Sequence, residues 1–394
     1  MAINIDDLRR LAMRRLPRAV FDFADGGAED EQTLRANHLD FSKLVFRPRV
    51  LVDVSQRDQT TTILGQPVSS PLIVAPTGLA GMLWPRGEIA AAQGAANRNV
   101  IYTLSTLGAC SVEQVAEASN GPLWFQLYVM KDREVTRSLV ERARQAGYKA
   151  LCLTVDLPVL GQRERDLRNG ATIPPKITVR NVLNVLQRPG WLRRVWLGPN
   201  ITFQNFVGAS TELTPEMGTL WQYVNSLNDA SVSWDDLAWF RSIWPGPLAL
   251  KGIMTGEDAR RAVAEGVEAI VVSNHGGRQL DSLPSAIEVL TEVVDAVGDR
   301  AEVILDGGVR RGTDVVKALS LGAKACMIGR PMLYGLGAAG QAGVERSIEI
   351  LQKEIDRSLA LLGRPTLADL DRTAVRLAGM PSPDRALRSA APAH

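Results

Sequence analysis

The segment SNHGGRQLD holds the residues best suited to catalysis. His275 precedes Arg278 by three positions, and Gly276 and Gly277 let the chain turn so that both side chains face the same way. An imidazole can act as a general base, and a guanidinium offers two parallel donors that match a carboxylate. A single histidine is usually structural, but Asp156 would fix the tautomer of this one if the fold brings the two together. We therefore expect acid–base chemistry on a substrate that carries a carboxylate.

Two glycine-rich segments predict a phosphate site. VILDGGVRRG and MIGRP both supply backbone N–H groups together with an arginine, Arg310 in the first and Arg330 in the second. Each motif alone is typical of an ordinary glycine turn. Barrels often bind phosphate at the loops after strands seven and eight, so the two motifs together favour a phosphorylated cofactor or substrate.

Lys251 ends the apolar run LALKG and has three interpretations. It is a lysine that reaches solvent at a strand end, a positive charge beside a flavin ring, or a Schiff-base nucleophile. The histidine–arginine pair makes the Schiff base the weakest of the three.

Eight short apolar runs recur along the chain, and most are followed by a helix-like stretch. Apolar strands that alternate with helices are typical of a parallel sheet buried on both faces, and eight such units favour a closed (β/α)8 barrel, the TIM-barrel fold. No GxGxxG follows an early strand, which argues against a Rossmann fold. The expected strands are Leu72–Ala75, Val100–Leu104, Leu123–Tyr128, Ala150–Val155, Leu248–Lys251, Ala269–Ser273, Val303–Leu305 and Ala325–Ile328, and the expected helices include Val112–Ala118, Arg133–Ala146, Thr255–Glu265, Ser285–Val297 and Gly312–Leu321.

Polar residues gather at the carboxyl ends of these strands, where such barrels bind their ligands. Polar groups are costly in a buried strand, so this placement requires partners or a ligand. In chain order they are Thr77 and Gly78, Ser105, Gln126 and Tyr128, Thr154 and Asp156, Lys251, Ser273, His275 and Arg278, Asp306–Arg310, and Gly329 and Arg330.

A long insertion after strand four interrupts the repeat, because about ninety residues separate two strands that a few residues usually join. Residues 161–200 hold eight Arg and Lys against two acidic residues. Trp191, Leu192, Val195 and Trp196 are expected to share one helix face. The insertion is either a solvated lid or, through residues 176–208, a contact with an anionic membrane surface. We divide the chain into an N-terminal helical segment (1–70) that packs on the barrel, the barrel itself (71–363, with the insertion 161–247) and a C-terminal tail (364–394).

The composition excludes several classes of protein. A net charge of +2 and 5% aromatic residues argue against nucleic-acid binding. Three cysteines and three histidines are too few for a disulfide framework or a metal cluster, so no metal is expected. The N-terminus predicts a basic amphipathic helix that begins at Asp6 or Asp7, not a signal peptide, and prolines exclude a spanning helix in the charge-free stretch Ile63–Pro85. We expect a cytoplasmic protein that lies on the cytoplasmic face of the membrane if the insertion binds lipid.

From Phe21 to Gly363 the chain resembles the FMN-dependent L-2-hydroxy acid dehydrogenases and oxidases, which include glycolate oxidase, flavocytochrome L-lactate dehydrogenase and (S)-mandelate dehydrogenase. The resemblance rests on FDFADGGAEDE, APTGLAG, FQLYV, TVDLPVLGQRERDLRNG, LKGI, SNHGGRQLD, DGGVRRGTDVVKAL and IGRPMLYGL. Within the family, GLAGMLWPRGE and SWDDLAWFRSIWP are most similar to mandelate dehydrogenase, with L-lactate dehydrogenase next.

The resemblance implies that FMN lies across the barrel mouth and that a 2-hydroxy acid is oxidised to a 2-oxo acid, by hydride transfer or through a carbanion. His275 is then the base, Asp156 its partner, Arg163 and Arg278 the carboxylate ligands, and Tyr128 a hydrogen-bonding phenol. The implied ring contacts are Pro76, Thr77, Gly78, Ser105, Gln126, Thr154, Lys251 and Ser273. The implied phosphate ligands are Asp306, Gly307, Gly308, Arg310, Gly329 and Arg330. A homotetramer is also implied.

At two positions the sequence gives further information on how closely the chain follows the family. Gly78 stands where oxidases of the family tend to carry alanine, which favours a dehydrogenase that passes electrons to a quinone or another acceptor. Phe23 replaces the usual tyrosine and removes one hydrogen bond to the substrate carboxylate, which is worth about 1.5–3 kcal/mol.

Three alternatives remain beside the dehydrogenase. The first is an oxidase that releases hydrogen peroxide, and the second is an idle flavin- or phosphate-binding barrel. A barrel that acts on nucleotides would need a cysteine at the site, whereas Cys326 is expected inside the eighth strand.

Overall fold

The computed structural model describes residues 2–170, 178–199, 201–206 and 228–379. Eight parallel strands close into a barrel in which the last strand pairs with the first, so the expected TIM-barrel fold is confirmed. Each expected strand is present, with ends that differ by no more than two residues. The strands are β4 (Leu72–Val74), β5 (Ile101–Ser105), β6 (Leu123–Leu127), β7 (Ala150–Thr154), β8 (Leu248–Ile253), β9 (Ala269–Ser273), β10 (Glu302–Asp306) and β11 (Ala325–Ile328).

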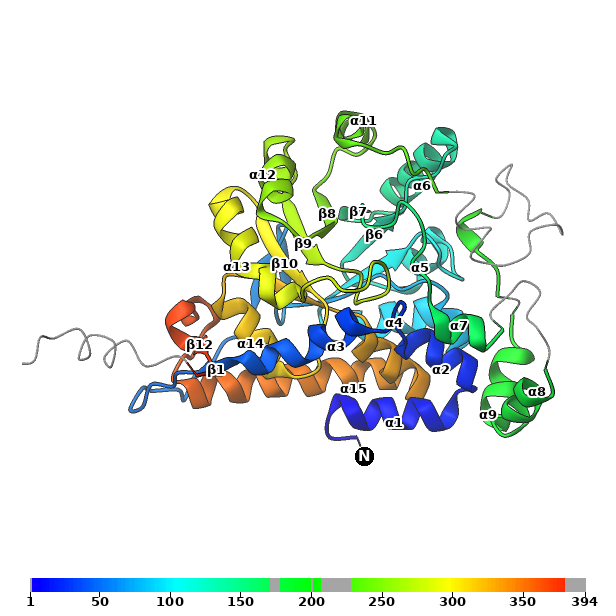
Figure 1. The fold of residues 1–394 in the computed structure, drawn as a ribbon, viewed down its shortest axis with the longest axis horizontal. Coiled ribbons are helices and arrows are strands. Elements are labelled where there is room, and N and C mark those ends of the chain that lie inside the picture. Colours follow the sequence, from blue (N-terminus) through cyan, green and yellow to red (C-terminus); the bar gives the residue numbers. More distant parts are fainter. Residues whose placement is uncertain (1, 171–177, 200, 207–227, 380–394) are drawn as a thin grey trace, which may run out of the picture.

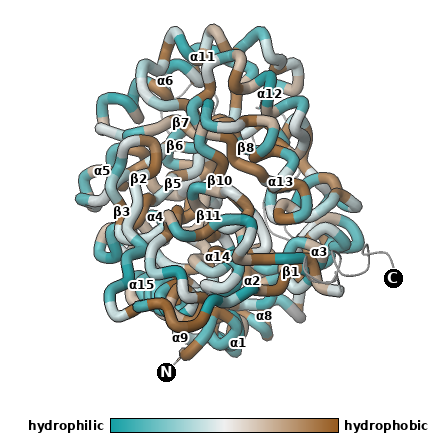
Figure 2. The backbone as a smooth tube through the Cα atoms, turned by 90° about the vertical axis from the view of Figure 1, so that its left-hand side faces the viewer, coloured by the Kyte–Doolittle hydropathy of each residue, from teal (hydrophilic) through white to brown (hydrophobic). Residues whose placement is uncertain are grey.

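Helices surround the barrel, as the ring of labels around the strands in Figure 2 shows. Several begin at residues whose side chains accept a backbone N–H: Ser111 caps α5, Asp132 caps α6 and Thr255 caps α12. The helices of this layer are α4 (Gly87–Ala96), α5 (Val112–Ala118), α6 (Arg133–Gln145), α11 (Leu237–Ile243), α12 (Gly256–Ala264), α13 (Ala286–Val297), α14 (Gly312–Ser320) and α15 (Arg330–Leu362), the last bent at Ala339–Gly340.

The interior of the barrel is filled at its amino-terminal end. Small residues such as Ala150, Ala249 and Ala269 leave room for the indole of Trp124, which is fully buried. The hairpin of β2 (Thr61–Ile63) and β3 (Gln66–Val68) covers this end, and Trp124 Nε1 donates to Gln66 Oε1 over 3.1 Å. Because the core is closed here, a ligand can enter only at the carboxyl ends of the strands.

The N-terminal segment runs along α15 on one side of the barrel (Figure 1). It comprises α1 (Ile5–Arg15), α2 (Arg18–Asp25), α3 (Gln32–Leu39), the turn η1 (Asp40–Lys43) and β1 (Leu44–Phe46), besides the hairpin. The prediction that α1 begins at Asp6 or Asp7 was wrong, because Asn4 caps it and accepts from Asp7 N.

The expected tail from residue 364 is in part a paired element. After the turns η7 (Leu367–Asp369) and η8 (Arg372–Ala374), β12 (Val375–Leu377) pairs with β1 in antiparallel register. Residues 380–394 of that prediction lie outside the described chain.

The insertion contains α7 (Glu164–Arg168), α8 (Val179–Leu186), α9 (Pro189–Trp191) and the π-helical turn η3 (Leu192–Trp196), followed by the short turns η4 (Gln204–Phe206) and η5 (Trp234–Asp236). The predicted range 161–247 also takes in α11, which lies just before β8 and packs on α6. Among the described residues, no helix is long and apolar enough to span a membrane.

The aromatic group predicted for the insertion faces the barrel. Trp191 is half-buried and donates from Nε1 to the carbonyl of Met82 over 2.8 Å, and Val195 is buried. Arg194 lies over the ring of Trp84, 4.6 Å from its centre. Trp191, Val195 and Arg194 therefore pack on the loop after β4. The side chain of Trp196 lies outside the described part.

Candidate active site

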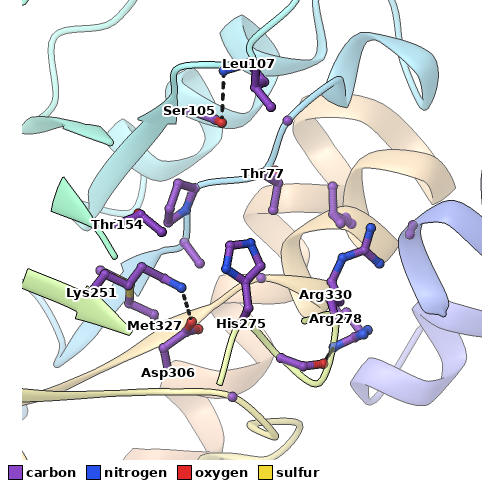
Figure 3. A pocket seen from close by; sticks show the side chains of 18 of the residues that line it. Thr77, Ser105, Leu107, Thr154, Lys251, His275, Arg278, Asp306, Met327 and Arg330 are labelled. Atoms are coloured by element: carbon purple, nitrogen blue, oxygen red, sulfur yellow. Dashed lines mark hydrogen bonds and ion pairs between the residues drawn. The ribbon is translucent and has the colours of Figure 1, made fainter. Parts of the chain in front are cut away.

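One cavity opens at the carboxyl ends of the strands (Figure 3). Most of the residues predicted for the site line it: Phe23, Pro76, Thr77, Gly78, Ser105, Tyr128, Thr154, Arg163, Lys251, His275, Arg278, Asp306, Gly307, Gly308, Arg310, Gly329 and Arg330. Asp156, Gln126 and Ser273 stand behind this lining, where they hydrogen-bond to His275, Ser105 and Lys251 respectively.

His275 connects a carboxylate to a phenol. Its Nδ1 lies 2.9 Å from Asp156 Oδ1, and its Nε2 lies 3.3 Å from the hydroxyl of Tyr128. A carboxylate accepts hydrogen bonds, so Nδ1 carries the proton and Nε2 keeps the lone pair on the side of Tyr128. The imidazole stands between the lysine–aspartate pair and two arginines in Figure 3.

The backbone conformation at His275 and at Gly252 brings the imidazole and the Asp156 carboxylate together. His275 adopts φ of 58°, and its N–H donates to Ser273 Oγ over 3.0 Å. The preceding Asn274 forms a reciprocal amide pair with Asn37 of α3, with lengths of 2.7 and 3.0 Å. Gly252 has φ of 113°, and a Cβ there would lie 2.7 Å from Asp156 Cβ, so only glycine lets β8 pass the carboxylate.

The electrostatics keep the imidazole neutral near pH 7. Burial lowers the pKa of His275 below its usual range, and the charge and hydrogen bond of Asp156 offset only part of this. Burial by itself would raise the pKa of Asp156, but His275 and Lys251 lower it, so Asp156 remains ionised. Burial also raises the pKa of Tyr128 to about 12, which keeps its hydroxyl protonated.

Main-chain carbonyls at the end of α2 hold two arginines. Arg278 Nη1 donates to the carbonyls of Phe23 and Gly26 over 2.8 and 2.9 Å. Arg330 donates to the carbonyls of Asp25, Gly26 and Gly276. The guanidinium of Arg278 also lies 5.3 Å from the ring centre of Phe23. Phenylalanine at this position therefore supports the arginine through its ring and its carbonyl, although it lacks a hydroxyl.

These guanidiniums lie close together. Burial lowers the pKa of Arg163, Arg278 and Arg330, and Arg163 lowers that of Arg278 further by like-charge repulsion. Main-chain carbonyls accept hydrogen bonds from Arg278 and Arg330 but carry no full charge, and the carboxylate of Asp166 offsets only part of the repulsion at Arg163 and Arg278. An anion bound at the cavity would relieve this repulsion.

On the opposite wall, a lysine is paired. Lys251 Nζ lies 2.9 Å from Asp306 Oδ2 and 2.9 Å from Ser273 Oγ, which itself donates to Asp306 over 2.8 Å. Burial alone would lower the pKa of Lys251, but Asp306 and Asp156 have the larger effect and raise it above its usual value, so the amine stays charged. A lysine held in this form is a poor Schiff-base nucleophile, which leaves the role of a fixed positive charge.

The sequence matches the family described as FMN-dependent dehydrogenase over residues 12–377. This chain belongs to the FMN-dependent dehydrogenases. It is 47% identical to the L-lactate oxidase of Nostoc sp., with 95% of this chain and 98% of that protein covered. It is 45% identical to a putative L-lactate dehydrogenase of Mycobacterium tuberculosis, with 94% and 88% covered. Among solved structures, the monotopic membrane protein (S)-mandelate dehydrogenase is similar with a TM-score of 0.90 and 40% identity, covering 95% of this chain and 99% of that one.

The cavity of this FMN-dependent dehydrogenase has the chemistry that FMN requires. Three buried polar atoms, Thr77 Oγ1, Gln126 Nε2 and Thr154 Oγ1, have no hydrogen-bond partner within the described chain. They offer both donors and acceptors to a ring with polar edges. Lys251, Arg310 and Arg330 supply positive charge, and the loops after β10 and β11 are open at Gly307 and Gly329. Among the described residues, no cluster of His, Cys, Asp or Glu could hold a metal ion.

The apolar part of the lining was not predicted from the sequence. It includes Ala24, Ala75, Leu79, Leu107, Leu157, Leu160, Phe203, Met327 and Leu333. Leu157 and Leu160 follow β7 within a motif already singled out, so their place could have been inferred. Phe203 gave no such signal, because it lies in the insertion far from any strand.

Removal of the unpartnered Thr154 hydroxyl should have opposite effects on stability and on FMN binding. Thr154→Val should raise the free energy of unfolding of the apoprotein by up to about 1 kcal/mol, because a buried hydroxyl without a partner is lost. The same change should weaken FMN binding by about two- to tenfold, the value of one hydrogen bond. Denaturation of the apoprotein and FMN fluorescence titration measure the two effects.

Thr103→Val is the matched control. Thr103 is buried in β5 with an unpartnered hydroxyl among the described residues, but it does not line the cavity. It should raise stability without changing FMN affinity. Equal FMN affinity in Thr154→Val and the parent protein would contradict the assignment of Thr154 to the cofactor.

Proposed function

We propose that the protein oxidises an L-2-hydroxy acid to the 2-oxo acid, with FMN as the electron acceptor in the first half-reaction. The observation that carries the proposal is a neutral imidazole, His275, which is paired with Asp156 in a cavity that the guanidiniums of Arg163 and Arg278 also line. The similar proteins act on acids of this class, as the names L-lactate oxidase, glycolate oxidase and (S)-mandelate dehydrogenase state.

In this proposal the arginines orient the substrate and the histidine takes its proton. Arg163 and Arg278 bind the carboxylate, Arg278 with donors other than the Nη1 that it uses for carbonyls. Tyr128 donates to the substrate hydroxyl, and His275 Nε2 accepts one substrate proton. Asp156 then stabilises the imidazolium through Nδ1. Phe23 packs beside the carboxylate site through its contact with Arg278. Oxidation to the 2-oxo acid removes two electrons and two protons, one from the hydroxyl and one from the α-carbon. His275 accepts one of these protons, and bound FMN would accept the two electrons and, on reduction, the equivalent of the other proton.

The remaining lining is assigned to the cofactor. Its ring would contact Pro76, Thr77, Gly78, Ser105, Thr154 and Lys251, with Gln126 and Ser273 close behind, and its phosphate would contact Asp306, Gly307, Gly308, Arg310, Gly329 and Arg330. Arg330 is committed to three carbonyls, so Arg310, which donates to Val309 O over 2.8 Å, is the more adaptable phosphate ligand of the two.

We further propose a dehydrogenase that passes electrons to a quinone or another organic acceptor. Gly78 supports this, because oxidases of the family that the chain resembles tend to carry alanine here. A Cβ at this position would lie 3.2 Å from Leu107 Cβ and 3.3 Å from Leu107 O, so Leu107 would have to shift by a few tenths of an ångström to admit alanine. The second candidate is an oxidase that releases hydrogen peroxide, which the 47% identity to L-lactate oxidase favours. Reoxidation of the reduced protein by air at a catalytically competent rate would select the oxidase.

We propose that the insertion rests on the cytoplasmic face of a membrane. On α8 the exposed residues Val179, Val182, Leu183 and Leu186 share one face by their spacing. The structurally similar (S)-mandelate dehydrogenase is a monotopic membrane protein. The apolar face is that of α8, not the aromatic group that packs on the barrel.

The homotetramer stays a prediction. The exposed side chains of Val50 and Leu51 provide apolar surface for contact between copies of the chain. The segment division 1–70, 71–363 and 364–394 is likewise kept as a proposal, with the lid starting at residue 161 and ending before α11.

Asp156→Asn tests the acid–base assignment through pH. The rate of flavin reduction by (S)-mandelate should fall as pH drops below the pKa of His275, because the protonated imidazole cannot take a proton. Asp156 raises the pKa of His275, so its neutral replacement should move this acid limb to lower pH. The rate on the plateau should also fall by about 10- to 100-fold, since the imidazolium loses a charged partner. Anaerobic stopped-flow absorbance measures both.

His275→Asn is the companion variant. It should retain FMN and lose about 10²- to 10⁴-fold in rate. A full rate in His275→Asn, or an acid limb that moves to higher pH in Asp156→Asn, would contradict the proposed base.

The membrane proposal predicts a loss of lipid binding when α8 is made acidic. Leu183→Glu with Leu186→Glu should lower binding to phosphatidylglycerol vesicles by about tenfold or more, because apolar burial is replaced by repulsion from anionic headgroups. Leu361→Glu, on the exposed face of α15, is the control and should bind as the parent does. Vesicle co-sedimentation that is equal for all three proteins would leave the insertion as a solvated lid.

A further inference from the structure

One wall of the cavity is apolar and has no role in holding FMN phosphate or a substrate carboxylate. It is formed by Leu107 after β5, Leu157 and Leu160 after β7, and Phe203 from the insertion. Phe203 is 8% exposed and is the largest of these side chains. Given the proposed function, the part of a 2-hydroxy acid that distinguishes one substrate from another must meet this wall.

A buried amide fixes the segment that carries Phe203. Asn205 is 2% exposed, and its Oδ1 accepts from Val112 N over 3.0 Å at the start of α5. Its Nδ2 donates to the carbonyls of Ser105 and Thr106 over 3.4 and 3.0 Å. All three partners are main-chain groups of the barrel, so the insertion is tied here to the rigid scaffold.

An arginine that is ion-paired to Glu113 also holds the main chain at Asn205. Arg142 of α6 donates to the carbonyl of Asn205 over 2.9 Å and binds Glu113 of α5 with two hydrogen bonds of 2.7 and 2.9 Å. Phe206 is buried beside it, with its ring edge-on to Phe203 at 6.5 Å between centres. The turn η4 is thus held on its backbone, its amide and its neighbouring ring.

Ser105 connects the contacts of Asn205 to the flavin site. Ser105, whose carbonyl accepts from Asn205, also lines the cavity, and its hydroxyl accepts from Leu107 N over 3.2 Å, as the dashed line in Figure 3 shows. Leu107 lines the apolar wall. One amide therefore fixes the position of Phe203 relative to Leu107 and to the end of β5.

We propose that Phe203 is the specificity-determining residue for the substrate side chain, that it favours an aromatic 2-hydroxy acid over a short one, and that Asn205 is the positioning residue for it. An aryl group fills the space between the phenyl ring and the leucines and gains edge-to-face or stacked contacts. A methyl group or a hydrogen atom leaves that surface without contact. The inference rests on the proposed oxidation of 2-hydroxy acids and deepens it by naming the substrate class.

The test compares kcat/KM for (S)-mandelate and L-lactate in the FMN-loaded protein with an artificial dye as acceptor. The parent protein should prefer (S)-mandelate. Phe203→Ala should lower the mandelate-to-lactate ratio by about tenfold or more, because the aromatic contact is worth this much and lactate does not make it. Phe203→Leu keeps the apolar character without the ring and should lie between the two. Gln204→Ala, which alters the neighbouring side chain outside the cavity, is the matched control and should leave the ratio unchanged.

Asn205→Ala should lower the same ratio with the FMN content retained, a change that loss of stability alone does not produce. Asn205→Asp keeps the acceptor for Val112 N but removes the donors to Ser105 and Thr106. It should also lower the mandelate-to-lactate ratio, and it serves as the second variant if Asn205→Ala folds poorly.

Two sets of results would overturn the inference. A parent protein that prefers lactate, or a ratio that does not change in Phe203→Ala, removes Phe203 as the specificity residue. A ratio that is unchanged in both Asn205 variants removes Asn205 as its positioning residue. If the parent oxidises neither acid nor any other 2-hydroxy acid, the proposed function fails instead, which is a separate outcome.

Discussion

The structure depends on positive charge that main-chain carbonyls hold in place and that nearby carboxylates offset only in part. The carboxyl-terminal end of α2 presents the carbonyls of Phe23, Asp25 and Gly26 to Arg278 and Arg330. A helix end of this kind is favourable for cations, but dipoles do not cancel two full charges. Burial alone would raise the pKa of Asp25, yet hydrogen bonds from Arg9 and Tyr334 and the charge of Arg330 lower it to about 2, so one carboxylate is shared between the anchoring of α2 and the charge of Arg330. The cavity therefore favours ligands that bring negative charge, a phosphate at one end and a carboxylate at the other.

The same constraint shapes the acid–base group. Positive neighbours and burial keep His275 neutral, and Asp156 prevents the pKa of the imidazole from falling further. A base of this kind takes a proton at neutral pH and is stabilised once it is charged. The left-handed backbone at His275 and the amide pair of Asn274 with Asn37 hold it there. The N-terminal segment thus contributes to the active site at two places, through α2 and through α3.

The sequence was sufficient for the barrel and for the polar side of the site. Strands buried on both faces appear as apolar runs, so their carboxyl ends, and with them His275, Lys251 and Arg330, could be placed. Contacts made by main-chain carbonyls leave no mark on residue type, so the role of α2 could not be seen. The same is true of Asn205, whose partners are the backbone groups of Ser105, Thr106 and Val112. The contact of Trp191 with the barrel could not be predicted either, because its partner is the carbonyl of Met82, a main-chain group far away in the sequence.

We propose that the protein recognises its substrate by the carboxylate, through Arg163 and Arg278. Anaerobic reduction of the FMN-loaded protein by (S)-mandelate and by methyl (S)-mandelate, followed by the visible absorbance of the flavin, measures the contribution of that carboxylate. The ester keeps the hydroxyl, the α-hydrogen and the ring but has no charge. We expect the acid to reduce the flavin at least about 100-fold faster than the ester at equal subsaturating concentration, since two charge-assisted hydrogen bonds are lost. Equal rates for the two compounds would contradict the account.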